Sequence, residues 1–277
     1  KTIDERIFLL KKCFKIIFNS NWSKRRFLHG MKNDYVNSEK LVVINQSAKK
    51  NKININNKKK IITFVGKLNK SKGYDLFKEA VTKILNEFHK WKAFSIGDED
   101  RRNIYINHKN HSELGFLKHK KALNILNKSE IAVIPSKWKE PFGRTALEAT
   151  SRGCATIISN RGGLIETSDH VVILKRLDSI NLYREIKNLI INSKKRKEIQ
   201  TKCRINVKHL INENTKLIDQ IRESCIPKFN LNFLNKKIKI INLYNQGQKL
   251  NHRLYNISLG KKFTNGFIRN EHDVLEI

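Results

Sequence analysis

The chain has 277 residues, of which 57 are Lys or Arg and 25 are Asp or Glu, so its formal net charge is +32. This length is ample for one or two domains with buried cores, and 39% hydrophobic residues in short runs argue against wholesale disorder. No apolar run reaches the roughly 18 residues of a membrane-spanning helix, and the Lys-interrupted residues 1–20 lack the pattern of a signal peptide.

The positive charge has two interpretations. One is a basic surface that meets phosphates, whether of nucleic acid, of anionic lipid or of a sugar nucleotide. The other is biased composition, because Lys, Asn and Ile abound throughout the chain. We favour the second as the main cause, since the Lys residues are spread along the chain and not gathered in one stripe. A charge of +32 still attracts the protein to anionic surfaces at low salt.

The four cysteines are scattered along the chain, at Cys13, Cys154, Cys203 and Cys225. They show neither the close pairing of a disulfide framework nor the spacing of metal ligands. Each stands in an apolar pattern, which predicts reduced, packed thiols in a cytosolic protein.

The first 60 residues begin with helix and strand patterns. They predict a helix over 1–14, a strand over 15–19, a helix from Trp22 to Leu28 capped by Ser20 or Asn21, and a strand over 41–45. Residues 46–60 are polar, rich in Lys and Asn and without sustained period, so we predict a linker there.

From residue 61 onward, apolar runs alternate with amphipathic segments. The pattern predicts strands over 61–65, 92–96, 130–134, 154–158 and 171–174, and helices over 74–90, 119–128, 144–152 and within 178–222. Strands that are apolar on both faces and alternate with helices indicate an α/β fold with a parallel sheet covered on both sides. Such sheets bind ligands at the carboxyl ends of their strands.

A different pattern follows Pro227. It predicts a strand over 238–243, a helix over 257–270 and a second strand over 273–277, which together would open another βαβ unit.

The segment GKLNKSKG, Gly66–Gly73, leaves the carboxyl end of the strand at 61–65. Gly66 lets the chain turn sharply, and Lys67 and Lys72 place two ammonium groups close to a helix start. Two such charges suit a diphosphate. A solvated Lys-rich turn is the alternative.

The segment PSKWKEPFGRTALE, Pro135–Glu148, carries two carboxylates eight residues apart, Glu140 and Glu148. Glu140 precedes a proline and is therefore extended, whereas Glu148 lies on the helix behind the loop. Two acceptor-only groups at different depths suit a polyhydroxylated ligand, and free amides after Gly143 suit phosphate oxygens. The alternative is that Glu140 only complements the dipole of that helix.

In order and spacing, EPFGRTALE, GCATIISNRGGLIE and FVGKLNKSKG resemble the carboxyl-terminal, donor-binding domain of the retaining glycosyltransferases of family four, also called glycosyl transferases group 1. These enzymes have the GT-B fold of two facing Rossmann-like domains. The resemblance covers about residues 15–222 and implies a Rossmann-like parallel sheet with helices on both faces. The implied segments are a remnant of the amino-terminal acceptor domain over 1–48, a donor domain over 49–226, and a linker with the truncated start of a second module over 227–277.

The resemblance implies a nucleotide-diphosphate sugar donor. Lys67 and Lys72 would neutralise the diphosphate, Glu140 would contact the transferred sugar, and Glu148 would hold the ribose. The implied catalytic residues are Glu140, Lys72 and Lys67, and the implied donor-binding residues are Gly66, Gly115, Phe116, Phe142, Gly143, Arg144, Thr145 and Glu148. Gly115 and Phe116 would border the base, and the backbone over 142–145 would support sugar and phosphate. The family works without a metal ion, so neither metal nor cofactor is expected.

The expected function is retaining, hexosyltransferase-type transfer of a sugar to a cell-surface glycan or lipopolysaccharide acceptor. We expect it in the cytoplasm, with peripheral contact with the anionic inner face of the cell membrane as an option. One alternative is a catalytically incomplete fragment that binds a nucleotide sugar and transfers nothing. A basic nucleic-acid-binding protein is the other, although the sequence has no recognised module for it. The acidic run Asp98–Asp100 departs from the family and would repel a nucleotide if it faced the site.

Overall fold

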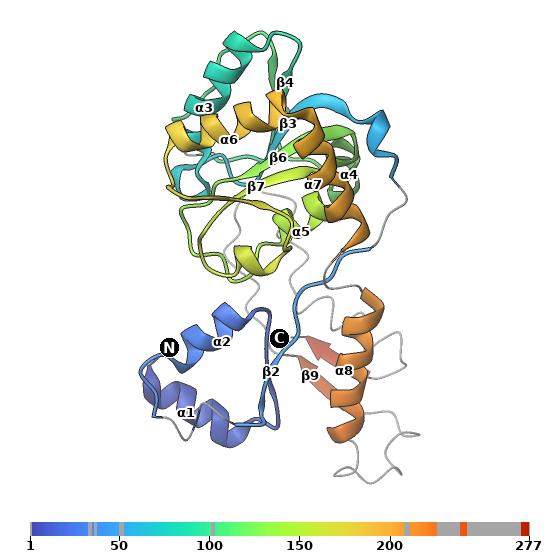
Figure 1. Cartoon of the computed structure of the whole chain (residues 1–277). Coiled ribbons are helices and arrows are strands. Elements are labelled where there is room, and N and C mark those ends of the chain that lie inside the picture. The colour runs from blue at the N-terminus through green and yellow to red at the C-terminus, as the bar shows by residue number, and fades with distance from the viewer. Residues whose placement is uncertain are drawn as a thin grey trace. The chain divides into compact units, whose positions relative to one another are not determined.

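A computed structural model of the chain describes residues 2–32, 35, 38–49, 53–100, 103–207, 211–225, 239–242 and 273–276 (Figure 1). The chain divides into two compact units, Lys1–Ile221 and Arg222–Ile277. In the second unit β9 (Lys239–Asn242) pairs in parallel with β10 (Asp273–Glu276), which confirms the two predicted strands. The helix predicted over 257–270 lies outside the described residues.

The first unit begins with a small α/β segment. It contains α1 (Ile3–Lys12), β1 (Ile16–Phe18), α2 (Asn21–Leu28) and β2 (Leu41–Val43). The two strands pair in parallel, and Leu10, Phe18 and Leu41 form the buried centre of their packing. The elements predicted for this part of the chain are therefore confirmed.

The rest of the first unit is built on a six-stranded sheet with the strand order β5-β4-β3-β6-β7-β8, in which every neighbouring pair is parallel. The strands are β3 (Lys59–Val65), β4 (Lys92–Ile96), β5 (His111–Glu113), β6 (Ser129–Ile134), β7 (Ala155–Ser159) and β8 (Val172–Leu174). The α-helices are α3 (Tyr74–Glu87), α4 (His119–Lys128), α5 (Arg144–Ser151), α6 (Ser179–Ile191), α7 (Ser193–Ile205) and α8 (Ile211–Cys225). Short 3-10 turns are η2 (Ile55–Asn57), η3 (Lys70–Lys72) and η4 (Leu164–Glu166).

Both faces of this sheet are covered, as the alternation along β6 shows. Ile131 and Val133 lie in one buried cluster, which contains the apolar side chains of α3 and α6. Ala132 and Ile134 lie in a second cluster, with side chains of α4 and α5. Figure 1 shows α3 and α6 running together along one side of the sheet. The predicted α/β architecture is confirmed, because side chains of successive strand residues point to opposite faces and here both faces are buried.

One strand of the sheet was not predicted from the sequence. β5 (His111–Glu113) pairs only with β4 at the edge of the sheet, and its three residues, His-Ser-Glu, are partly or fully exposed. An edge strand of three polar residues carries no hydrophobic period, so nothing in the sequence distinguished it from a loop.

The predicted linker over 46–60 is wrong at its end. η2 and the start of β3 occupy residues 55–60, and Lys58 is only 9% exposed. Its Nζ donates to the carbonyl oxygens of Leu126 at 3.1 Å, Asn127 at 3.2 Å and Ser129 at 2.7 Å. The first two carbonyls belong to the last turn of α4 and the third to the first residue of β6, so Lys58 adds a donor where the helix runs out of its own amides. Burial lowers the pKa of the Lys58 amine.

The cysteines that the structure describes are free thiols, and Cys154 and Cys203 are buried while Cys13 is half-buried. Burial raises the pKa of the Cys154 thiol, and it raises the pKa of Cys203 to about 12. Packed, protonated thiols agree with the prediction from their apolar surroundings.

The loops after β6 and β7 approach so closely that one position must be glycine. Gly162 forms a parallel bridge with Glu140, and the amide of Gly163 donates to the Glu140 carbonyl at 2.7 Å. Gly162 has a φ of +65°, and a Cβ atom added to it would lie 2.1 Å from the Glu140 carbonyl oxygen. Gly115 has a similar φ of +62°, but an added Cβ would meet nothing within 4 Å.

We expect Lys58→Ala to lower the free energy of unfolding by about 1–3 kcal/mol, because the carbonyl groups of Leu126, Asn127 and Ser129 each lose the hydrogen bond from its amine. Urea unfolding measures this loss. Lys60→Ala, which removes an equal charge from an exposed position two residues away, is the control and should change stability much less. Equal losses in the two variants would contradict a capping role for Lys58.

We expect Cys13 to be the first of the three described cysteines to react with iodoacetamide at about pH 8.5, where an ordinary thiol is half ionised. Cys154 and Cys203 should react only after denaturant is added, because their raised pKa values keep both thiols protonated. Mass spectrometry of tryptic peptides gives the order, and alkylation of Cys203 in the folded protein would contradict this structure.

We expect Gly162→Ala to destabilise the protein by about 1–3 kcal/mol more than Gly115→Ala. Both variants force a side chain into left-handed backbone, but only the first also drives a Cβ atom into the Glu140 carbonyl. The difference between their free energies of unfolding therefore isolates the steric clash. If the two losses are equal, the close approach of the two loops is wrong.

Candidate functional site

The centre of the candidate site is an ion pair between two loops at the carboxyl edge of the sheet. Lys72 ends η3, after β3, and its Nζ lies 2.6 Å from Oε1 of Glu140, in the loop after β6. The same oxygen accepts a hydrogen bond from the Ser136 hydroxyl at 2.8 Å. The side chains of Lys72 and Glu140 are 32% and 15% exposed, so the pair is partly shielded but open to solvent.

Backbone contacts hold the loop of Glu140 against its neighbours. The carbonyl of Ser71 accepts hydrogen bonds from the amides of Lys137 and Trp138, each at 2.9 Å. The Ser159 hydroxyl, at the end of β7, donates to the Ser136 carbonyl at 2.6 Å. Because β3, β6 and β7 are adjacent strands, their three carboxyl-end loops can tie one another in this way.

A second cluster surrounds Glu148 on α5. Its Oε1 accepts hydrogen bonds from Nε2 of His119 at 2.8 Å and from Nε of Arg144 at 2.9 Å. The Glu148 side chain is 17% exposed, whereas those of His119 and Arg144 are largely exposed. The arrangement is a shielded carboxylate with two exposed donors.

The structure places the glycines of the predicted set along the same edge. The Gly66 amide donates to the carbonyl of Ile96, and the Gly97 amide donates to the Gly115 carbonyl, both at 2.9 Å. The ends of β3, β4 and β5 are thus connected through backbone groups. Beside them, Lys67 and Phe116 are exposed.

The contact expected of Phe142 is one through its backbone. Its ring is only 1% exposed and packs with Ala48 and Leu147, so the side chain itself is part of the core. Gly143 follows in left-handed conformation, with a φ of +113°, and α5 starts there without a side-chain cap. Arg144 and Thr145 are the first two residues of this helix, where amides and helix dipole favour an anion.

One carboxylate of the acidic run Asp98–Asp100 is hydrogen-bonded to the turn that carries Lys72. Oε2 of Glu99 accepts a hydrogen bond from Nδ2 of Asn69 at 2.8 Å, and Oδ1 of Asn69 accepts the amide of Lys72 at 3.1 Å. Glu99 therefore helps to orient the turn that carries Lys72.

Three residues of this constellation were not predicted from the sequence: Asn69, His119 and Ser136. Asn69 lies within GKLNKSKG and Ser136 within PSKWKEPFGRTALE, so their polar side chains were a usable signal. His119 carried no signal, because its contact with Glu148 joins the start of α4 to α5 and arises only in the fold.

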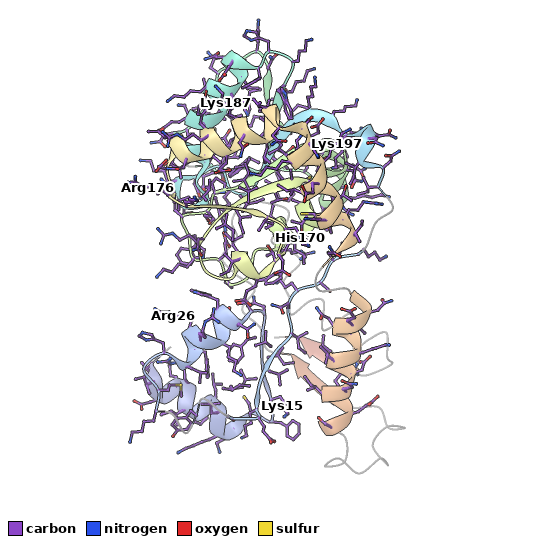
Figure 2. The ribbon with its side chains drawn as sticks, in the orientation of Figure 1. Lys15, Arg26, His170, Arg176, Lys187 and Lys197 are labelled. Carbon is purple, nitrogen blue, oxygen red and sulfur yellow. The ribbon has the colours of Figure 1, made fainter. Side chains whose placement is uncertain are left out.

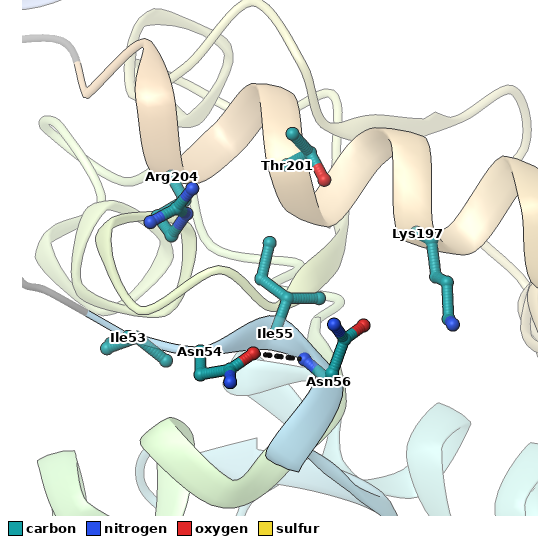
Figure 3. A pocket seen from close by; sticks show the side chains of 7 residues that line it. All are labelled: Ile53, Asn54, Ile55, Asn56, Lys197, Thr201 and Arg204. Atoms are coloured by element: carbon teal, nitrogen blue, oxygen red, sulfur yellow. Dashed lines mark hydrogen bonds between the residues drawn. The ribbon is translucent and has the colours of Figure 1, made fainter.

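The cavity described next, which lies away from the carboxyl edge of the sheet, is lined by none of the predicted site residues. Figure 3 shows a cavity of about 540 Å³ that is lined by Ile53, Asn54, Ile55, Asn56, Lys197, Thr201 and Arg204. The labelled cations of Figure 2, among them Lys15, Arg176 and Lys197, come from widely separated segments of the chain.

Among the described residues no cluster of three or more His, Cys, Asp or Glu could hold a metal ion. In the same part of the chain no helix combines the length and the apolar character needed to cross a membrane.

Solved structures share this fold. The crystal structure of Anabaena HepE in complex with UDP-glucose matches with a TM-score of 0.65 over 80% of this chain and 67% of that chain, at 16% identity. A glycosyltransferase from Rickettsia africae matches with a TM-score of 0.67 over 83% of this chain and 69% of that chain, at 19% identity.

Sequence comparison gives the family. Spore coat protein SA of Bacillus subtilis is 31% identical over 158 residues, 51% of this chain and 42% of that protein. An uncharacterized glycosyltransferase of Methanocaldococcus jannaschii is 34% identical over 128 residues, 43% of this chain and 32% of that protein. The matched region thus spans less than half the length of these relatives. The family model for glycosyl transferases group 1 matches residues 45–205, more than half of the chain, and the protein therefore belongs to this family.

Proposed function

We propose that the chain provides the donor site of a glycosyltransferase that moves a sugar from a nucleotide-diphosphate sugar to an acceptor. The observation that carries this proposal is the Lys72–Glu140 ion pair, which lies at the carboxyl edge of the sheet close to the uncapped start of α5. A cation, a carboxylate and free helix amides in one place suit a ligand that joins a sugar to a diphosphate.

The diphosphate would bind Lys72, Lys67 and the start of α5. A unit charge pair 4 Å apart is worth about 4 kcal/mol at an effective dielectric of 20 and about 1 kcal/mol in bulk water, so we expect the partly shielded Lys72 to contribute more than the exposed Lys67. This interaction grows as the sugar leaves and charge develops on the diphosphate, which is the condition for a catalytic effect. Glu140, already oriented by Ser136 and Lys72, would accept hydrogen bonds from the sugar hydroxyls.

The nucleoside would extend toward Glu148. A carboxylate accepts two hydroxyl donors of a ribose well, and His119 and Arg144 are exposed enough to move aside. Gly115 and Phe116 would border the base. Because HepE, which shares this fold, is described in complexes with UDP and UDP-glucose, uridine nucleotides are the first ligands to test.

The finer features of the proposed reaction follow from the family resemblance. We propose retention of configuration, no metal requirement, a hexosyl donor, and a cell-surface glycan or lipopolysaccharide acceptor. We also propose that the enzyme is cytoplasmic and makes peripheral contact with the anionic inner face of the membrane. The net charge of +32 favours this contact. The proposed domain boundaries at residues 48 and 226 belong to the same set of hypotheses.

A second candidate is nucleotide-sugar binding without transfer. It is favoured by the fact that the match covers less than half of each curated relative, so residues that bind the acceptor need not be part of this chain. Donor binding combined with no sugar release would support it, whereas measurable transfer by this chain would exclude it.

We expect Lys72→Ala to weaken UDP binding about tenfold or more, since one charge-assisted contact with the diphosphate is lost. Lys70→Ala is the matched control, because it removes an equal charge from an exposed position on the same turn, and it should weaken binding less than about threefold. Isothermal titration with UDP, repeated with GDP and ADP, measures both effects. Equal losses in the two variants would show that bulk charge and not a defined site attracts the nucleotide.

We expect Glu140→Gln to leave UDP affinity within about twofold and to lower sugar release from the donor by about a hundredfold. The Glu140 carboxylate is proposed to contact the transferred sugar of the donor, and UDP carries no such sugar. Addition of EDTA should leave UDP affinity unchanged. An affinity that needs divalent cation, or a Glu140→Gln variant as active as the unaltered protein, would contradict the proposed mechanism.

A further inference from the structure

The start of α2 needs partners for its backbone amides, and it finds some of them far away in the sequence. A helix leaves its first four amides without acceptors inside the helix. In α2 the regular bonds begin with the amide of Lys24, which donates to the carbonyl of the N-cap Ser20, and the amide of Ser23 donates to the Ser20 side chain. The amides of the first two helical residues donate to one carboxylate: Asn21 to Oε2 of Glu166 at 2.7 Å, and Trp22 to Oε1 at 2.8 Å.

This cap is unusual in its origin. Glu166 lies 145 residues after Asn21, in η4, and follows the Gly162-Gly163 pair of the loop after β7. The first turn of α2 contains no acidic residue of its own, although the helix carries three cations. The negative charge that complements its dipole therefore comes from Glu166, whose side chain is only 15% exposed.

The same turn of α2 also binds the loop that carries Glu140. The hydroxyls of Ser20 and Ser23 are both within hydrogen-bond reach of the Pro141 carbonyl, and for Ser23 the distance is 3.1 Å. Ser20 is fully buried. Pro141 is the residue next to Glu140, so these contacts act one peptide unit from the carboxylate of the proposed site.

The two loops that α2 contacts are also joined to each other. The Gly163 amide donates to the Glu140 carbonyl at 2.7 Å, and Gly162 forms a bridge with Glu140. The loop that contains Glu166 therefore binds the Glu140 peptide directly. The start of α2 binds the next residue, Pro141. Glu166 in turn binds the amides of α2, so the three segments are connected in a closed set of contacts.

We propose that Glu166, with Ser20 and Ser23, forms a latch that positions Glu140 by binding the first turn of α2. In this arrangement Glu166 is a positioning residue that acts through α2 and the two loops. A displacement of α2 changes the Glu140 peptide, and a displacement of the Glu140 loop releases the amides of α2. The consequence for turnover rests on the proposed glycosyltransferase function, but the coupling itself does not.

Amide hydrogen exchange measured by NMR on the full chain without ligand tests the coupling. In Glu166→Ala, exchange should speed up about tenfold or more at Asn21 and Trp22, which lose their acceptor, and also at Gly163, whose acceptor becomes mobile. Exchange at Ile131 and Val133 in β6 should not change. Glu166→Gln, which keeps one acceptor oxygen, should give intermediate rates.

Three results would overturn the latch. Fast exchange at Asn21 and Trp22 with an unchanged Gly163 would show a helix cap that does not reach Glu140. Equal acceleration at Ile131 and Val133 would show general destabilisation. Unchanged exchange at Asn21 and Trp22 would show that Glu166 is not the cap. Glu198→Ala, which breaks an exposed ion pair with Lys202, is the control variant and should leave all of these amides unchanged.

Kinetics separate this proposal from the proposed function. With UDP-glucose as the donor, Glu166→Ala should lower kcat about fivefold or more and leave KM within about twofold, because it displaces Glu140 but touches neither Lys67 nor Glu148. Glu166→Gln should restore part of kcat. An unchanged kcat would remove the positioning role. If the unaltered protein neither binds UDP nor turns over the donor, the proposed function with this nucleotide fails, and the exchange measurements still decide the coupling.

Discussion

The Lys72–Glu140 ion pair depends on the parallel pairing of β3 with β6. The two residues are 68 positions apart, yet each follows the carboxyl end of its strand, and adjacent parallel strands open their carboxyl ends at the same edge. The other contacts of the site build on this register. Asn69 orients the turn of Lys72, and Ser136 orients the carboxylate of Glu140. The Ser71 carbonyl accepts hydrogen bonds from the amides of Lys137 and Trp138 in the loop of Glu140. A shift of the register would separate all of these partners at once.

The loop of Glu140 is under unusual restraint for a surface loop. Hydrogen bonds from three directions hold it: backbone groups of the turn after β3 and of the glycine pair after β7, and the Ser20 and Ser23 hydroxyls at the start of α2. Loops usually carry function on a rigid scaffold and are themselves mobile. Here hydrogen bonds restrain both the backbone of the loop and the Glu140 carboxylate. Such pre-organisation is what electrostatic stabilisation of a departing diphosphate requires.

The strongly patterned elements could be predicted from the sequence, and the weakly patterned ones could not. β3, β6 and β7 contain continuous apolar runs, and α3 repeats its apolar residues at helical spacing, so tertiary contacts only confirmed what local pattern required. β5 has no such pattern, and it exists because β4 offers a free edge. Lys58 stands in a polar run that resembles a linker, but the carbonyl groups at the end of α4 and the start of β6 accept its hydrogen bonds and so offset the cost of burying its amine.

The sequence by itself determined the α/β class, the position of the polar loops at the carboxyl edge, and the residue types in EPFGRTALE and GKLNKSKG that resemble a family of glycosyltransferases. These are local properties, because period, glycine placement and motif spacing are set within short stretches of chain. Only the tertiary structure decided which side chains meet: Lys72 with Glu140, His119 with Glu148, and Glu166 with the start of α2. Such pairs join residues up to 145 positions apart, and an ion pair or a hydrogen bond forms only when the folded backbone brings donor and acceptor to about 3 Å, a distance that no sequence pattern encodes.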